Sequence, residues 1–137
     1  MEVRIYYEDT DAAGVVYHAN YLKYFERART EYLRERGLSV SELAACGIIF
    51  PVVRMEIGFK APGLHDDLLT ISTQPTHVGG SSFTLRQQAV RKTDGMVLVD
   101  SLVKLACANS TLNARRIPPE VRQVLEAGLP QTGALPF

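Results

Sequence analysis

The sequence has only two cysteines and no long apolar run. Cys46 and Cys107 fit neither a zinc motif nor a C-x-x-C redox pair, so we expect two buried free thiols. No apolar stretch reaches the length of a membrane span, and no charged-then-apolar signal segment precedes Arg4. The cytoplasm is therefore the default expectation for the location of this protein.

Neither sign of charge dominates. The chain carries 15 basic and 15 acidic residues, and its formal net charge is zero. This balance argues against a broad electrostatic surface for nucleic acid or for an anionic membrane. A local basic patch for one anionic ligand stays open, and Lys60, Arg91 and Lys92 lie near expected strand ends. Exposed basic residues, however, usually only keep a surface hydrated.

Several common catalytic and cofactor-binding motifs are also missing. The sequence contains no G-x-S-x-G, no G-x-x-x-x-G-K-[ST] and no G-x-G-x-x-G motif. His18, His65 and His77 are far apart and lack the spacing of metal ligands. We therefore expect no metal and no cofactor, and we interpret His65 with Asp66 as a solvated turn.

The composition that remains is that of an ordinary globular protein. With 137 residues, of which 46% are apolar and 22% charged, the chain is expected to form one domain over residues 1–137. The stretch from about 128 to 137 contains Pro130, Gly133 and Pro136 and is predicted to be a flexible tail.

The first part of the chain predicts a strand followed by a long helix. Residues Val3 to Tyr7 are rich in β-forming side chains. From Asn20 to Arg36, apolar residues recur every three or four positions, as on one face of an amphipathic helix, and Gly37 is placed to end it. Ser39 with Glu42 is typical of a capping box, which predicts a short second helix.

The rest of the chain predicts four more strands. Apolar and polar residues alternate from Val53 to Phe59, which indicates a strand with one buried face. Hairpin signals at Gly79-Gly80 and at 93–95 indicate that the last three strands form an antiparallel meander. The last of them is apolar on both faces, and Pro119 starts a short final helix. The later strands are predicted near 69–73, at 83–89 and from 96 to about 109.

These elements predict an α+β fold in which a five-stranded antiparallel sheet wraps around one long helix. A single helix has one apolar stripe to bury, and the sheet has one apolar face that can cover it. A last strand that is apolar on both faces suggests that a second subunit covers part of the sheet. We therefore expect at least a homodimer.

The residues with the most useful chemistry lie between the first strand and the long helix. Asp9 and Asp11 precede Gly14, where the backbone can turn sharply, and His18 lies just before the helix. A carboxylate beside a helix N-terminus can act on a polarised carbonyl, because the helix end offers unpaired N–H groups to an oxyanion. Taken singly, a loop aspartate is more often a cap or a turn former.

The string from Tyr7 to Tyr21, YEDTDAAGVVYHANY, with FERAR at 25–29, closely resembles the acyl-CoA thioesterases of the hotdog fold. The nearest branch looks like the YbgC-like, Tol–Pal-associated family, which is related to 4-hydroxybenzoyl-CoA thioesterase. The resemblance covers most of the chain in element order. It implies hydrolysis of acyl-CoA to a carboxylic acid and CoA, with no cofactor because CoA is part of the substrate.

The resemblance also implies which residues act. The family's catalytic carboxylate falls on Asp11 and not on Asp9, as general base or as nucleophile; its associated histidine falls on His18 and a tyrosine on Tyr7. The backbone N–H of His18 matches the family's carbonyl-polarising group. In that family two protomers join their sheets edge to edge, dimers often pair into tetramers, and the active site lies at the subunit interface.

Two other functions stay open at this point. One is a hotdog hydratase or dehydratase, which would hydrate an enoyl-CoA. The other is a non-catalytic module that binds an acyl thioester or acyl carrier protein, which would bind acyl-CoA without turnover. The sequence decides neither the acyl chain length, nor CoA against acyl carrier protein as the carrier, nor dimer against tetramer.

Overall fold

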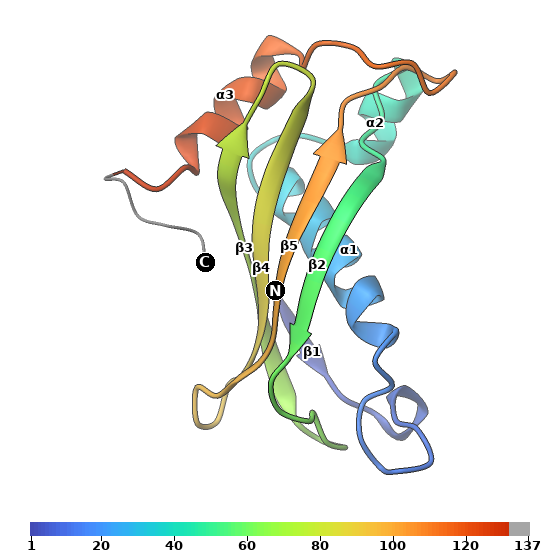
Figure 1. Cartoon of the computed structure of the whole chain (residues 1–137), viewed down its shortest axis with the longest axis vertical. Coiled ribbons are helices and arrows are strands. Elements are labelled where there is room, and N and C mark those ends of the chain that lie inside the picture. The colour runs from blue at the N-terminus through green and yellow to red at the C-terminus, as the bar shows by residue number, and fades with distance from the viewer. Residues whose placement is uncertain (132–137) are drawn as a thin grey trace.

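The computed structural model describes residues 1–131. One five-stranded antiparallel sheet runs in the order β1-β3-β4-β5-β2, and α1 lies along one face of it (Figure 1). This is the predicted α+β arrangement. The strands are β1 Glu2–Arg4, β2 Val52–Phe59, β3 Leu68–Val78, β4 Ser82–Arg91 and β5 Val97–Ala106; the helices are the 3-10 turn η1 Tyr7–Asp9, α1 Asn20–Arg34, α2 Val40–Ala45 and α3 Pro119–Ala127.

Helix α1 supplies the centre of the core. Its first half packs with Ile5, Leu69 and Val99 in one apolar cluster, and its second half packs with the sheet and α3 in another. The helix ends as expected, because Gly37 adopts a left-handed conformation with φ 87°. One member of the predicted stripe, Leu22, is 44% exposed instead of buried. The buried residues of α1 are Tyr21, Tyr24, Phe25, Ala28, Tyr32 and Leu33.

The first strand is shorter than the predicted range 3–7. β1 pairs with β3 only from Glu2 to Arg4, and the chain then turns into η1. The carboxylate of Asp9 closes this turn, because its Oδ2 accepts a hydrogen bond from the Tyr6 N–H at 2.8 Å. A local bond from side chain to backbone therefore overrides the β-forming tendency of the tyrosines.

The predicted buried face of the strand at 53–59 is wrong in part. β2 lies at the edge of the sheet and pairs with β5 alone. Val53 is 57% exposed and Phe59 is 52% exposed, whereas Met55 and Ile57 are half-buried. The alternation identified the strand correctly, but position in the sheet decides how much of its inner face is covered.

The prediction that the last strand is apolar on both faces is wrong in part, because the outer face carries Asp100 and Lys104 as well as Leu102 and Ala106. Leu98 belongs to the buried core, beside a register irregularity between Ala89 and Val90 of the neighbouring strand. The outer face of β5 carries Asp100, which forms an ion pair with Arg86 at 3.1 Å. The outer face of β5 is therefore mixed, which weakens the expectation that a second subunit covers it.

Three further predictions concern the cysteines, membrane-spanning helices and the C-terminal tail. Cys107 is buried as predicted, but Cys46 is exposed because it lies at the C-terminal end of the short helix α2. Within residues 1–131, no helix combines the length and the apolarity that a membrane span needs. The predicted flexible tail lies outside the described residues from position 132 onward.

Candidate active site

The loop around Asp11 is a tight turn held by its own backbone. The Asp11 N–H donates to the Val15 carbonyl at 2.9 Å, and the Gly14 N–H donates back to the Asp11 carbonyl at 3.0 Å. Gly14 adopts φ 80°, a conformation that other residues rarely adopt. The Oδ1 atom of Asp11 accepts from the Ala13 N–H at 2.9 Å. Within residues 1–131, no group donates to Oδ2, so this exposed carboxylate keeps one oxygen available.

Asp9, in contrast, is fully hydrogen-bonded within the protein. Its Oδ1 accepts from the Tyr24 hydroxyl at 2.8 Å, and its backbone carbonyl accepts from the Asn20 amide at 2.9 Å. Tyr24 is only 3% exposed. Burial, together with the Asp9 carboxylate, raises the pKa of Tyr24 well above its usual value, so that its hydroxyl stays protonated and keeps donating. Of the two carboxylates, only Asp11 has a side-chain oxygen that accepts no hydrogen bond from residues 1–131.

The N-terminus of α1 lies next to this loop. The N–H groups of Asn20, Tyr21 and Leu22 donate to the carbonyls three residues before them, at 2.8, 3.3 and 3.2 Å. No side chain caps the helix. In the described part of the chain, the N–H groups of His18 and Ala19 meet no acceptor, which leaves them as donors at the positive end of the helix dipole.

A hollow of about 350 Å³ brings these groups together. Phe59, at the end of β2, forms its far wall, with ring centroids 6.2 Å from His18 and 6.1 Å from Tyr21. The polar lining groups come from Asp11, His18, Tyr21 and Lys60. The hollow therefore combines a carboxylate with the N-terminal end of a helix, which suits attack on a carbonyl group. The remaining lining residues are Val15, Val16, Ala61, Pro62 and Gly63.

Several known proteins are similar to this chain in sequence and in fold. The sequence model described as the thioesterase superfamily matches residues 13–98, a range that begins just after Asp11. The chain belongs to the thioesterase superfamily. It is 40% identical to the acyl-CoA thioesterase YbgC of Haemophilus influenzae over 122 residues, and this alignment covers 88% of each chain. It is 34% identical over 112 residues to the long-chain acyl-CoA thioesterase FadM of Escherichia coli strain K12, covering 81% of this chain and 84% of that one.

Solved thioesterase structures have the same fold as this chain. The structure of a gentisyl-coenzyme A thioesterase matches with a TM-score of 0.82 and 35% identity, over 89% of this chain and 98% of the other. The fold of this thioesterase is thus the hotdog fold, as the resemblance of the Asp11 string implied. Because the matched family range starts at residue 13, the case for Asp11 itself depends on the geometry of the hollow.

The structure brings two of the three expected site residues together. Asp11 and His18 both line the hollow. Tyr7 does not line it: its side chain is 80% exposed and lies edge-on to His65, with ring centroids 6.2 Å apart. Tyr7 still touches the turn through its backbone, since its carbonyl accepts from the Thr10 hydroxyl at 2.7 Å.

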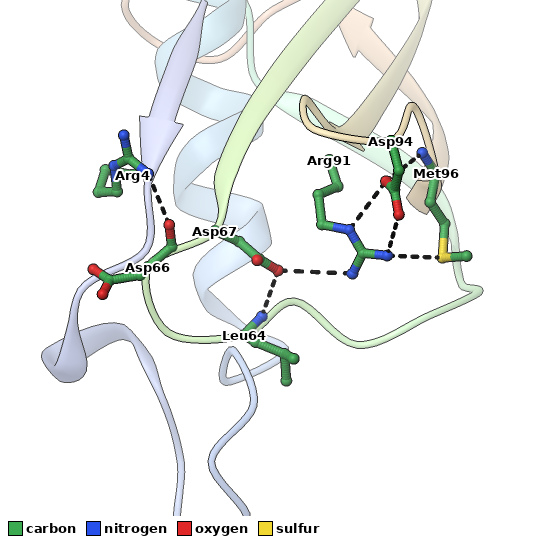
Figure 2. Close-up of polar contacts among 7 residues, drawn as sticks. All are labelled: Arg4, Leu64, Asp66, Asp67, Arg91, Asp94 and Met96. Carbon is green, nitrogen blue, oxygen red and sulfur yellow. Dashed lines mark hydrogen bonds and ion pairs between the residues drawn. The ribbon is translucent and has the colours of Figure 1, made fainter.

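Of the three basic residues considered for an anionic ligand, only Lys60 reaches the hollow. Arg91 lies between two carboxylates, with Asp94 at 2.6 Å and Asp67 at 3.9 Å (Figure 2). Lys92 pairs with Glu2. Asp67 also accepts from the Leu64 N–H at 2.9 Å, which supports the segment beside the Asp11 loop (Figure 2).

Sequence reasoning missed the residues of the hollow that come from the end of β2 and from the connection after it. Phe59 and Gly63 are distant from Asp11 in sequence, and no local pattern links them to it. A Cβ atom at Gly63 would lie 2.7 Å from the Tyr21 hydroxyl oxygen and 3.0 Å from Val16, so this wall of the hollow requires glycine. Tyr24 was missed as well, although its place one turn after Asn20 puts it near the loop.

Proposed function

We propose that this thioesterase hydrolyses acyl-CoA thioesters to a carboxylic acid and CoA, with Asp11 as the reacting carboxylate. One observation carries the proposal: the available oxygen of Asp11 shares a hollow with the N-terminal end of α1, where the His18 and Ala19 N–H groups meet no acceptor in residues 1–131. The names of the similar proteins support the same reaction class.

In the proposed mechanism, the thioester carbonyl oxygen accepts from the His18 N–H. The helix dipole and this donor stabilise the negative charge that develops on the oxygen. Asp11 then either removes a proton from water, which attacks the carbonyl carbon, or attacks that carbon itself. In both routes the C–S bond breaks and CoA leaves as a thiolate; in the second, water then hydrolyses the mixed anhydride. The side chain of His18, which lines the hollow, helps to position the substrate, whereas the Tyr7 side chain lies outside the hollow.

The remaining parts of the proposal concern the partners. We expect no cofactor, a cytoplasmic location, and acyl-CoA as substrate, with acyl carrier protein as a second carrier to be tested. Lys60, exposed at the hollow, is the residue that we expect to meet the phosphates of CoA. We propose a homodimer, or a tetramer built from two dimers, joined through β2. The support is an edge strand with three exposed apolar side chains, Val52, Val53 and Phe59.

The first test is release of free thiol from a panel of short, long and aromatic acyl-CoAs. We expect Asp11→Asn to lower kcat by about 10² or more, because the amide is neither a base nor a nucleophile. Asp66→Asn is the matched control: Asp66 is another exposed loop carboxylate, and asparagine tolerates its φ of 72°. Turnover that is weak and equal in all three proteins would contradict the role of Asp11.

A second experiment separates the two roles of Asp11. In a single turnover in ¹⁸O-labelled water, the label enters the Asp11 side chain only if a mixed anhydride forms and water attacks it at the Asp11 carboxyl carbon, whereas general-base catalysis places the label only in the released acid. The alternatives have their own readouts. Hydration of an enoyl-CoA would favour a hydratase, and binding of acyl-CoA without turnover, unaffected by Asp11→Asn, would favour a binding module.

A further inference from the structure

A second hollow lies at the opposite end of α1 from Asp11. It has a volume of about 110 Å³ and lies between the second half of α1, the start of α2, the sheet and α3. Its floor is apolar and buried, with Phe83 3% exposed, Leu105 5% exposed and Leu125 not exposed. Phe50 closes one side, edge-on to Phe83 with ring centroids 5.6 Å apart. Such a cavity suits an apolar ligand and not water.

The charged and hydroxyl-bearing residues that line this second hollow come from one side, helix α1. Glu26, Arg29 and Thr30 all come from α1. Arg29 donates to the side-chain carbonyl of Gln87 at 3.1 Å, and the amide of Gln87 donates to the Phe25 carbonyl at 2.9 Å. Gln87 is fully buried and bonded at both ends of its amide, so it offers no unpaired group to a ligand. The interior therefore favours hydrocarbon over a polar group.

The two hollows lie along the same pair of elements. Phe59, at the end of β2, lines the Asp11 hollow, and Phe50, just before the start of β2, lines the second one. On the helix, Asn20 begins α1 beside the first hollow and Arg29 lines the second. At the α-helical rise these two residues are about 13 Å apart along the axis, which is close to the length of an extended decanoyl chain.

Partly exposed apolar side chains lie on both elements between the two hollows. On the helix, Leu22 precedes Glu26 by one turn on the same face and is 44% exposed. On β2, Met55 and Ile57 are half-buried and pack towards the core. An acyl chain that runs from the Asp11 hollow to the second one would therefore contact apolar side chains of both α1 and β2 on the way.

We propose that the cavity at Phe50 holds the distal end of a medium-length fatty acyl chain whose thioester lies at Asp11. The inference rests on the proposed thioesterase function and names its substrate class: saturated acyl-CoAs of about octanoyl to decanoyl length. Each methylene group buried in such a site adds roughly fourfold to binding. Selectivity by chain length is then set at the far end of α1, away from the reacting atoms.

The test fills the cavity without touching the site of reaction. Val40 lines the cavity, is half-buried and starts α2, so phenylalanine can project into the empty volume. Val124→Phe is the matched control, because Val124 is also half-buried against the same cluster but does not line the cavity. The kcat/KM is measured for acetyl-, octanoyl- and decanoyl-CoA. We expect Val40→Phe to lower the kcat/KM for octanoyl- and decanoyl-CoA about tenfold or more. The kcat/KM for acetyl-CoA should stay within about twofold of the wild-type value.

A second variant tests the opposite change. Phe50→Ala enlarges the cavity and is expected to move the preferred length towards lauroyl- and myristoyl-CoA. A wild-type enzyme that hydrolyses acyl-CoAs, with a chain-length profile that neither variant alters, would overturn this inference alone. An equal loss for all three substrates in Val40→Phe, with an unchanged profile in Phe50→Ala, would also overturn it. A wild-type protein that hydrolyses none of them would overturn the proposed function as well.

Discussion

Asp9 and Asp11 are two positions apart in sequence and have different surroundings. Both oxygens of the Asp9 side chain accept hydrogen bonds, from Tyr6 and Tyr24, whereas Asp11 accepts one. Asp9 thereby ties the start of the loop to the first turns of α1. We regard Asp9 and Tyr24 as positioning residues that hold Asp11 next to the helix end.

Removal of the Tyr24 hydroxyl tests this role. Tyr24→Phe keeps the ring in the core but leaves Asp9 Oδ1 without its donor. We expect kcat for acetyl-CoA to fall about tenfold with KM little changed, and the free energy of unfolding to fall by about 1–2 kcal/mol. Tyr32→Phe is the control, because Tyr32 is a buried tyrosine on the same helix in the other core cluster. Equal kcat values in both variants would contradict a positioning role.

Gly63 provides a second prediction about a single residue. Gly63→Ala places a methyl group 2.7 Å from the Tyr21 hydroxyl oxygen, and both sit at the wall of the hollow. We expect a loss of about 1–3 kcal/mol of stability and a lower kcat/KM. Gly80→Ala is the control, since a Cβ atom there meets nothing within 4 Å. Thermal unfolding and thiol release measure the two effects, and a fully active, fully stable Gly63→Ala variant would refute the close contact.

At the scale of elements, the edge strand β2 matters most. It pairs on one side only, and its exposed apolar residues are unusual for an edge that faces solvent. Phe59 belongs at once to this edge and to the Asp11 hollow. A second protomer paired along β2 would therefore lie next to the site of reaction.

A lysine on this edge tests the proposed dimer. Val53→Lys adds a charge to an apolar position that is 57% exposed, and edge lysines oppose strand pairing. We expect the variant to shift towards the monomer in analytical ultracentrifugation and to lose activity in parallel. Leu112→Lys is the control, because Leu112 is 70% exposed but lies in the loop after β5 and not in an edge strand. An unchanged sedimentation coefficient in Val53→Lys would argue against assembly through β2.

At the scale of the whole molecule, three buried tyrosines of α1 couple stability to alkaline pH. Burial raises the pKa of Tyr21, Tyr24 and Tyr32 above their usual value of 10.0. A raised folded-state pKa means that the contribution of each group is fully present below the unfolded pKa. It is lost as the pH rises from there through the folded-state value.

The thermal midpoint is therefore expected to hold up to about pH 10 and to fall steeply above it. Each group contributes a slope of about 1.4 kcal/mol per pH unit between its two pKa values. Tyr24→Phe should flatten this fall, whereas Tyr6→Phe, at a position 61% exposed, should not. Melting curves from about pH 8 to pH 11 measure the difference, and parallel curves for the two variants would contradict it.

The sequence by itself determined the elements and the neighbourhood of Asp11. Periods of about 3.6 and of 2 define α1 and the long strands, because they record which face of each element is buried. Asp11, His18 and the start of α1 are adjacent in the chain, so a local turn is enough to bring them together. The hairpin signals placed β3, β4 and β5 as a meander for the same local reason.

Only the tertiary structure decided what depends on pairing over long distances. The place of β2 at the edge, the inward turn of Leu98 and the commitment of Asp9 to Tyr24 all follow from contacts between separate segments. Phe59, Lys60 and Gly63 reach the hollow because β2 ends beside the start of α1. A local pattern records only which face of an element is buried. Which partner covers that face, and how completely, is set by the register and order of strands that are far apart in the chain.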